Sequence, residues 1–166
     1  MQRLFALLAA HRVDYQVLHH PPVHTSQEAA LIRGTPVTMG AKALLFQADD
    51  HKILLVTQAH RRIETRRFKR QHHIRDLYML SPELLLEHYG LEIGAVPPFG
   101  SLLNVPTYAD DRLFALPKIV FNAGSRSTSV ILATSDYQHI EHPIAERLAS
   151  DDTRDSSVTG LYGATQ

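Results

Sequence analysis

The stretch from Gly94 to Gly100, "GAVPPFG", places two consecutive prolines and a phenylalanine between glycines. Glycine adopts backbone angles that other residues avoid, and it lets a ligand approach the main chain closely. Proline fixes its own φ, lacks an N–H and restricts the residue before it. The stretch therefore predicts a rigid, non-helical loop with accessible backbone, which is either a tight turn or one wall of a binding site.

Lys42 is the second residue that suggests chemistry, because it enters an apolar segment, "AKALLF", that should form a largely buried strand. A lysine there either extends out of the strand end into water or projects into a cleft, where its charge meets a ligand. Taken alone, the residue favours the first interpretation.

Common catalytic and metal-binding motifs are absent from the sequence. The chain has no cysteine, which excludes disulfides, thiolate nucleophiles and cysteine-ligated zinc. It also lacks a P-loop, a dinucleotide-binding glycine motif, H-E-x-x-H and G-x-S-x-G. Among the eleven histidines, His19, His20 and His24 surround a Pro-Pro turn, and His72 and His73 are helix neighbours that diverge. We expect no metal and no cofactor.

Charge is balanced overall but concentrated locally. Lys and Arg together number 17, as do Asp and Glu, so net charge predicts no partner. One window, "RRIETRRFKRQHHIR", nevertheless holds a dense basic set with a single acid, Glu64: Arg61, Arg62, Arg66, Arg67, Lys69, Arg70 and Arg75. Such a patch suits a polyanion such as RNA, and a solvated helix face is the equally weighted alternative.

Patterning predicts one mixed α+β domain over residues 1–149 and a flexible, polar tail over 150–166. We expect helices at 2–12, 27–33, 63–73, 81–90 and from 135, and strands at 14–20, 41–48, 52–59, 77–80 and 128–134. The apolar N-terminal run is too short to span a bilayer, and no clear cleavage site follows it. These features predict a cytoplasmic protein without a membrane partner.

In this order, the motifs resemble the YbaK/ProX family of aminoacyl-tRNA editing domains, which are related to the editing domain inserted in bacterial prolyl-tRNA synthetases. The resemblance runs from about His19 to His139 and includes "HHPPVHTSQEAA", "GAKALLF", "KILLVTQAHRRIE", "LYMLSPELLLEHYGLEIGAVPPFG" and "KIVFNAGSRSTSVILATSDY". Glycine, three residues and proline is common by chance. Its occurrence with the strand lysine and the Pro-x-His-Thr segment is specific.

The resemblance implies a barrel-like mixed sheet with helices around it, and metal-independent hydrolysis, in trans, of the ester that joins a wrong amino acid to tRNA. In the family the strand lysine lies in the editing pocket, and the Gly-x-x-x-Pro loop offers backbone donors close to the scissile ester. These positions match Lys42 and Gly94 to Pro98. The threonine before the second helix matches Thr25, which implies a pocket wall or a hydroxyl contact.

The chemistry of ester hydrolysis is compatible with these roles. Negative charge develops on the carbonyl oxygen, and loss of one preorganised N–H donor typically raises the barrier by about 3 kcal/mol. Prolines cannot donate, so the donors of this loop must come from Gly94, Ala95, Val96, Phe99 or Gly100. A protonated Lys42 would hold the terminal adenosine phosphate or stabilise the oxyanion, whereas a neutral Lys42 would act as a base. We prefer the charged role.

Other positions are weaker candidates. Asn122 and Gly124, in "FNAG", either line the pocket or form a strand-end turn, and the side chain of Phe99 is expected in the core rather than on the substrate. Glu64 stands where many family members have aspartate, so the role of that acid is open. The basic segment is more basic than is usual in the family, and it either holds the acceptor stem or is peculiar to this protein.

By analogy with the family, the first expected substrate is tRNA(Pro) mischarged with alanine or cysteine. A non-catalytic module of the same fold that binds tRNA, an aminoacyl-tRNA synthetase or a free amino acid is the alternative. A hydrolase of small esters is the third interpretation.

Overall fold

The computed structural model describes residues 1–151. The helices in this range are α1 (Gln2–Ala10), α2 (Ser26–Arg33), α3 (Thr65–Gln71), α4 (Pro82–Tyr89) and α5 (Thr134–Glu141), with 3₁₀ turns η1 (Val37–Met39), η2 (Gly100–Leu103) and η3 (Asp111–Ala115). The strands are β1 (Tyr15–His19), β2 (Ala41–Ala48), β3 (His51–Gln58), β4 (Leu77–Met79), β5 (Thr107–Asp110), β6 (Lys118–Ser125), β7 (Thr128–Ala133) and β8 (Ile144–Glu146). Of the predicted tail, all but Ser150 and Asp151 lies outside the described residues.

Local signals explain where the helices begin and end. The Thr25 hydroxyl accepts a hydrogen bond from the Glu28 N–H at the start of α2, and the helix ends at Gly34 in the left-handed region. In α4, Ser81 caps the first turn, Pro82 occupies the first position, and Gly90 ends the helix. None of the helices in residues 1–151 is long and apolar enough to cross a membrane.

The strands form two sheets, one with order β4-β2-β3-β5-β8 and one with order β1-β7-β6. β2 pairs antiparallel with β3 and β4, whereas β3–β5 and β5–β8 are parallel. A single parallel bridge between Gly40 and Val120 connects the sheets. The α+β class is confirmed. The described strands do not close into a barrel, so this detail of the resemblance is not confirmed.

The two faces of β2 bury different cores. Ala41, Ala43 and Leu45 contribute to the main core, which also contains Ile119 and Phe121 of β6. The alternate β2 residues Phe46 and Ala48 pack into a second cluster with Ile53 and with Phe68 of α3. Lys42 is placed by this alternation on the face opposite the main core.

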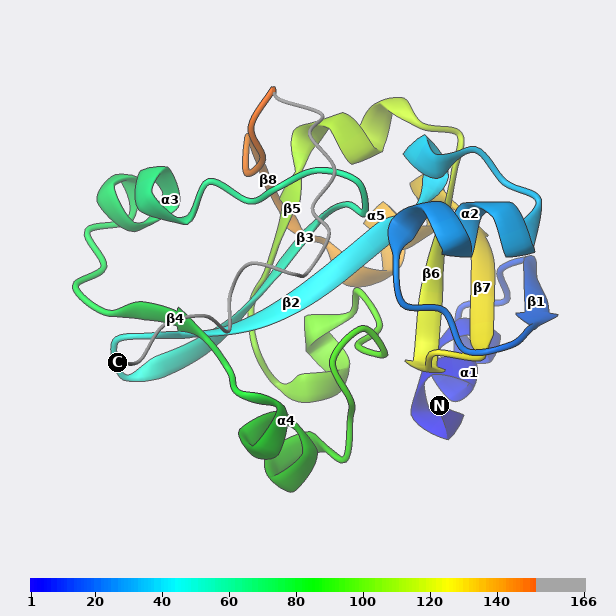
Figure 1. Cartoon of the computed structure of the whole chain (residues 1–166), viewed down its shortest axis with the longest axis horizontal. Coiled ribbons are helices and arrows are strands. Elements are labelled where there is room, and N and C mark those ends of the chain that lie inside the picture. The colour runs from blue at the N-terminus through cyan, green and yellow to red at the C-terminus, as the bar shows by residue number, and fades with distance from the viewer. Residues whose placement is uncertain (152–166) are drawn as a thin grey trace.

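Strands β2 and β6 begin together at the bridge and then run apart, with β2 crossing the molecule and β6 remaining beside β7 (Figure 1). The proline loop lies against both strands. The Gly124 N–H of β6 donates to the Ala95 carbonyl at 2.9 Å. Gly94 and Val96 line a small apolar crevice together with residues 43–45 of β2. Helix α2 lies across β6 and β7 (Figure 1), on the face that Lys42 shares.

Candidate active site

The proline loop is held by side chains and backbone from two elements. Asn122 Nδ2 donates to the Gly94 carbonyl at 2.6 Å, and the Tyr137 hydroxyl donates to the Pro98 carbonyl at 2.9 Å. Gly94 has φ +82°, a conformation that other residues adopt only with strain. At the far end, a Cβ on Gly100 would collide with the Thr107 hydroxyl. The loop is therefore rigid before any ligand binds.

The hydrogen bonds narrow the set of backbone donors. The Ala95 N–H bonds to the Glu92 carbonyl, and the Gly100 N–H bonds to the Thr107 hydroxyl, both at 3.0 Å. Within residues 1–151, the N–H groups of Gly94, Val96 and Phe99 have no partner. The Phe99 ring is buried against Phe121 and Tyr137 in the main core, as its hydrophobicity predicted. Of these residues Gly94 is exposed, whereas Val96 and Phe99 are buried, and which of their N–H groups meets a ligand stays a prediction.

Lys42 and Asn122 occupy equivalent positions on the two strands that flank this loop. Lys42 is two residues beyond Gly40, and Asn122 is two residues beyond Val120, the partner of Gly40 in the parallel bridge. Both side chains therefore point to the same side of the bridge that joins the two sheets. Lys42 makes no hydrogen bond or ion pair within residues 1–151, and burial lowers its pKa to about 8.

Two more buried polar atoms near Lys42 lack partners in the described part of the chain. Thr57, the cross-strand partner of Lys42, is fully buried and its Oγ1 bonds to nothing there. His60 is 8% exposed, and its Nδ1 is equally without a partner. Burial lowers the His60 pKa, and the charges of Arg61 and Lys42 lower it further. Buried polar atoms are nearly always satisfied, so these two are candidates for contact with water or a ligand.

A polar network under α2 joins the loop to a charged side chain that the sequence did not single out. Arg33 donates from Nη2 to Asn122 Oδ1 at 2.6 Å and from Nε to Ser129 Oγ at 2.9 Å. His20 Nε2 lies 2.7 Å from the same Ser129 Oγ. Burial lowers the Arg33 pKa to about 10. No carboxylate in residues 1–151 forms an ion pair with Arg33.

Linear pattern gave no signal for this network. Arg33 stands in the last turn of α2, where a basic residue is ordinary. His20 is one of three histidines around a Pro-Pro turn. Ser129 is a small polar residue in an apolar strand. The fold alone brings α2, β6, β7 and the end of β1 together.

The remaining predicted pocket residues have defined structural surroundings, and their contact with substrate remains a prediction. Thr25 is exposed, and its hydroxyl caps α2. Gly124 has φ +84° and anchors the loop through its N–H. Pro98 is buried and gives its carbonyl to Tyr137. The side chain of Glu64, beside α3, makes no hydrogen bond or ion pair within residues 1–151.

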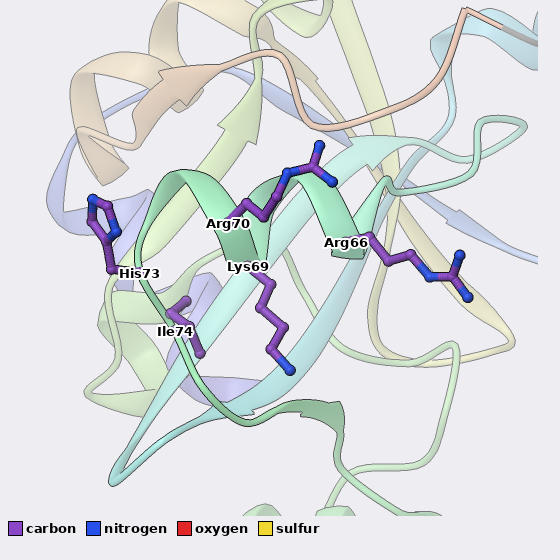
Figure 2. A pocket seen from close by; sticks show the side chains of 5 residues that line it. All are labelled: Arg66, Lys69, Arg70, His73 and Ile74. Carbon is purple, nitrogen blue, oxygen red and sulfur yellow. The ribbon is translucent and has the colours of Figure 1, made fainter.

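The structure divides the basic segment into two groups. Arg61 donates to Gln58 Oε1 and the Ser150 carbonyl, and Arg67 donates to the Arg147 and Ala149 carbonyls, so both fix the C-terminal segment of the described chain. A second group has no ion pair within residues 1–151: Arg62, Arg66, Lys69 and Arg70. Figure 2 shows Arg66, Lys69 and Arg70 fanning out from α3, and with His73 and Ile74 they line an open hollow.

No group of three or more His, Asp or Glu side chains within residues 1–151 is arranged to hold a metal ion. The site therefore offers backbone donors, a lysine, a guanidinium and neutral polar groups.

Comparisons with known proteins identify the family. The family model described as "Aminoacyl-tRNA editing domain" matches residues 20–140. The chain is 34% identical over 149 residues to the multifunctional Ser/Thr-tRNA deacylase ProXp-y of Escherichia coli K12, covering 86% of this chain and 88% of that protein. It is 30% identical over 97 residues to a proline–tRNA ligase of Thermosipho melanesiensis, covering 58% of this chain and 17% of the ligase.

The fold agrees with these sequence matches. A crystal structure of a candidate trans-editing enzyme for prolyl-tRNA synthetase superposes with a TM-score of 0.78 at 23% identity, covering 90% of this chain and 96% of that one. At this identity the superposition supports the fold alone. The family match and the E. coli relative go further: the chain belongs to the aminoacyl-tRNA editing domain family, and the predicted aminoacyl-tRNA deacylase activity is confirmed.

Proposed function

We propose that this protein acts in trans on tRNA mischarged with serine or threonine and hydrolyses the aminoacyl ester at the Lys42 site. The observation that carries the proposal is a desolvated, unpartnered Lys42 on the strand beside a rigid loop with free N–H groups. The name of the E. coli relative supports serine and threonine as the amino acids. They replace alanine and cysteine as the first substrates to test.

The loop and Lys42 would divide the stabilisation of the oxyanion. When water adds to the ester carbonyl, negative charge develops on the carbonyl oxygen, within reach of the Gly94 and Val96 N–H groups. These donors need no reorganisation because Asn122 and Tyr137 already fix the loop. With a pKa of about 8, Lys42 is mostly protonated at neutral pH and adds a positive charge.

The intermediate then collapses by breaking the bond between the acyl carbon and the ribose oxygen. That oxygen takes up a proton, and the products are the free amino acid and a tRNA with a free terminal hydroxyl. In this scheme Lys42 would donate that proton. The proton that the attacking water releases would restore the charge of Lys42, so that one water is consumed and the cycle needs no cofactor.

The cations on α3 and just before it that have no ion pair within residues 1–151 would bind the body of the tRNA. The segment from His60 to Glu64 connects the end of β3, whose Thr57 pairs with Lys42, to the start of α3. Arg62, Arg66, Lys69 and Arg70 therefore follow the site along one continuous stretch of chain. Cations without acidic neighbours suit phosphate contacts, which are salt-dependent.

The test compares wild type with Lys42→Ala on one tRNA charged in turn with serine, threonine, alanine and cysteine. Lysine replaced by alanine should lower kcat/KM for the seryl ester by about 100-fold or more, in line with the loss of one charged stabilising group. Lys118→Ala is the matched control, because Lys118 is exposed at the start of β6. It should retain wild-type activity.

Each other interpretation has its own result. Equal activity of wild type and Lys42→Ala would remove Lys42 from the site. A wild type that binds tRNA in a salt-sensitive way but deacylates nothing would favour the non-catalytic module. Equal turnover of aminoacyl-tRNA and an aminoacyl nucleoside would favour a hydrolase of small esters.

A further inference from the structure

Arg33 is a guanidinium whose position is fixed and whose charge is not neutralised. Its Nε and Nη2 donate to the neutral oxygens of Ser129 and Asn122, and no Asp or Glu side chain in residues 1–151 pairs with it. Ser129 is fully buried, whereas Arg33 and Asn122 are half-buried, so the network runs from the interior toward the surface of the molecule. Three of the five N–H bonds of a guanidinium remain after these two contacts.

Packing does not explain this charge. Removing a cation from water costs several kcal/mol unless an anion and hydrogen bonds compensate, and an apolar side chain of similar size often packs at lower cost. The neutral partners of Arg33 also have partners of their own: Ser129 Oγ lies 3.3 Å from Asn122 Oδ1 and 2.7 Å from His20 Nε2. The network would persist without the guanidinium, and Arg33 is only half-buried, so its spare N–H groups are open to water or to a ligand.

The location of Arg33 suggests what those N–H groups meet. Asn122 connects Arg33 directly to the Gly94 carbonyl, on the loop that would receive the scissile ester. In a seryl or threonyl ester, only Cα and Cβ separate the side-chain hydroxyl from the scissile carbonyl. The phosphate of the terminal nucleotide lies beyond the whole ribose. A group that adjoins the loop through Asn122 would therefore meet the hydroxyl before the phosphate.

We propose that Arg33 is a specificity-determining residue that donates a hydrogen bond to the side-chain hydroxyl of the seryl or threonyl ester. The inference rests on the proposed function and explains why serine and threonine should be preferred over alanine. An alanyl ester would displace water from the Arg33 N–H group without giving it a partner. Sites built to bind a substrate hydroxyl reject analogues that lack it by large factors, up to about 10⁴-fold.

The experiment uses one tRNA charged with serine or with alanine and measures the ratio of the two kcat/KM values. For Arg33→Leu we expect the seryl-to-alanyl ratio to fall at least tenfold, through loss of activity on the seryl ester. Arg33→Lys keeps the charge but loses the planar donor set, and should give an intermediate ratio. Arg3→Leu is the matched control, because Arg3 is exposed and has no ion pair within residues 1–151, and its ratio should equal that of wild type.

The ratio does not depend on the fraction of folded enzyme, so a partly unfolded variant still gives a valid result. A second measurement compares binding of seryl and alanyl adenosine analogues with a non-hydrolysable amide linkage. Wild type should bind the seryl analogue at least tenfold more tightly than the alanyl analogue. Arg33→Leu should bind the two analogues about equally.

An active wild type with an unchanged ratio in Arg33→Leu would overturn this inference and leave the proposed function standing. An equal loss on both esters that grows smaller when the substrate lacks phosphate would show that Arg33 binds phosphate instead. A wild type inactive on every ester would overturn the proposed function, and this inference with it.

Discussion

Arg112 and Arg33 are both partly buried, and they differ in what faces their charge. Arg112 forms a two-point ion pair with the fully buried Asp110, at 2.8 and 3.0 Å, and also donates to the Ala149 carbonyl. Its pKa is raised by the hydrogen bond from its side chain to Asp110. Arg33 has only neutral partners, and burial lowers its pKa. Arg112 stabilises the fold through an ion pair, whereas Arg33 keeps N–H donors that are free to bind a ligand.

The same distinction separates the pocket from α3. Lys42 and Arg33 are desolvated cations without an acid, so the fold bears the cost of placing them there. Arg66 and Arg70 are exposed, where a charge costs little. Burial without a counter-ion is therefore the stronger indication of a binding role.

The largest effect should come from breaking the paired arginine. Arg112→Leu would leave the carboxylate of Asp110 buried without its counter-ion, and we expect the free energy of unfolding to fall by about 3 kcal/mol or more. Denaturant unfolding measures the loss. Asp110→Asn in the Arg112→Leu background removes the lone charge and should restore part of the stability. A double variant no more stable than Arg112→Leu would mean that packing, and not charge pairing, accounts for the role of Arg112.

The pH dependence of deacylation sharpens the assignment of Lys42 as the charged pocket residue. Because burial lowers its pKa to about 8, the ammonium is present below that pH and lost above it. If the charged form stabilises the oxyanion, kcat/KM should be flat near neutral pH and fall toward tenfold per unit above pH 8, after subtraction of uncatalysed hydrolysis. An active Lys42→Arg variant should stay flat to higher pH. A rate that rises up to pH 8 would assign Lys42 as a base.

Folding stability should change in the opposite direction over the same range. The folded-state pKa of Lys42 lies below that of an unfolded lysine, near 10.4. Between these values the unfolded state binds more protons, so the contribution of Lys42 to stability rises with pH. Deprotonation of Lys42 therefore does not destabilise the fold, and it cannot explain a loss of activity above pH 8 through unfolding.

Neutralising the exposed cations of α3 should have a smaller and salt-dependent effect. The triple variant Arg66→Gln, Lys69→Gln, Arg70→Gln should raise KM for aminoacyl-tRNA about three- to tenfold at low salt, with kcat unchanged. Each lost phosphate contact lowers the slope of log affinity against log salt by about 0.7–0.9. The control triple Arg3→Gln, Arg12→Gln, Lys118→Gln removes the same charge from exposed positions elsewhere. Equal effects of both triples would mean that only net charge matters.

Local patterns in the sequence predicted much of the fold. The caps of α2 and α4 and the β2–β3 hairpin depend on neighbouring residues, and the structure has them where they were expected. The parallel pairing of β3 with β5, and of β5 with β8, joins segments that are distant in the chain. Short strands carry no local signal of which partner they will meet.

The site divides in the same way. Lys42 and the proline loop could be singled out because their residue types are unusual for a strand and a turn. The network of Arg33, Asn122 and Ser129 could not, because its members come from three elements and each is ordinary in its own. In the basic segment, the sequence predicts a binding role for residues that the structure uses to hold the fold. Arg61 and Arg67 look like their neighbours in sequence, yet they bind backbone carbonyls from residues 147–150.

The smallest effect should come from Arg33→Leu, measured in the same unfolding experiment as Arg112→Leu. Removing an unpaired, desolvated guanidinium leaves no buried carboxylate behind, and Ser129 and Asn122 still have each other. We expect the free energy of unfolding to change by no more than about 1 kcal/mol, in either direction. A loss as large as that of Arg112→Leu would make Arg33 a structural residue, and the two arginines would no longer differ. A small loss together with a changed seryl-to-alanyl ratio would give the two arginines separate roles. Arg112 would stabilise the fold, and Arg33 would select the substrate.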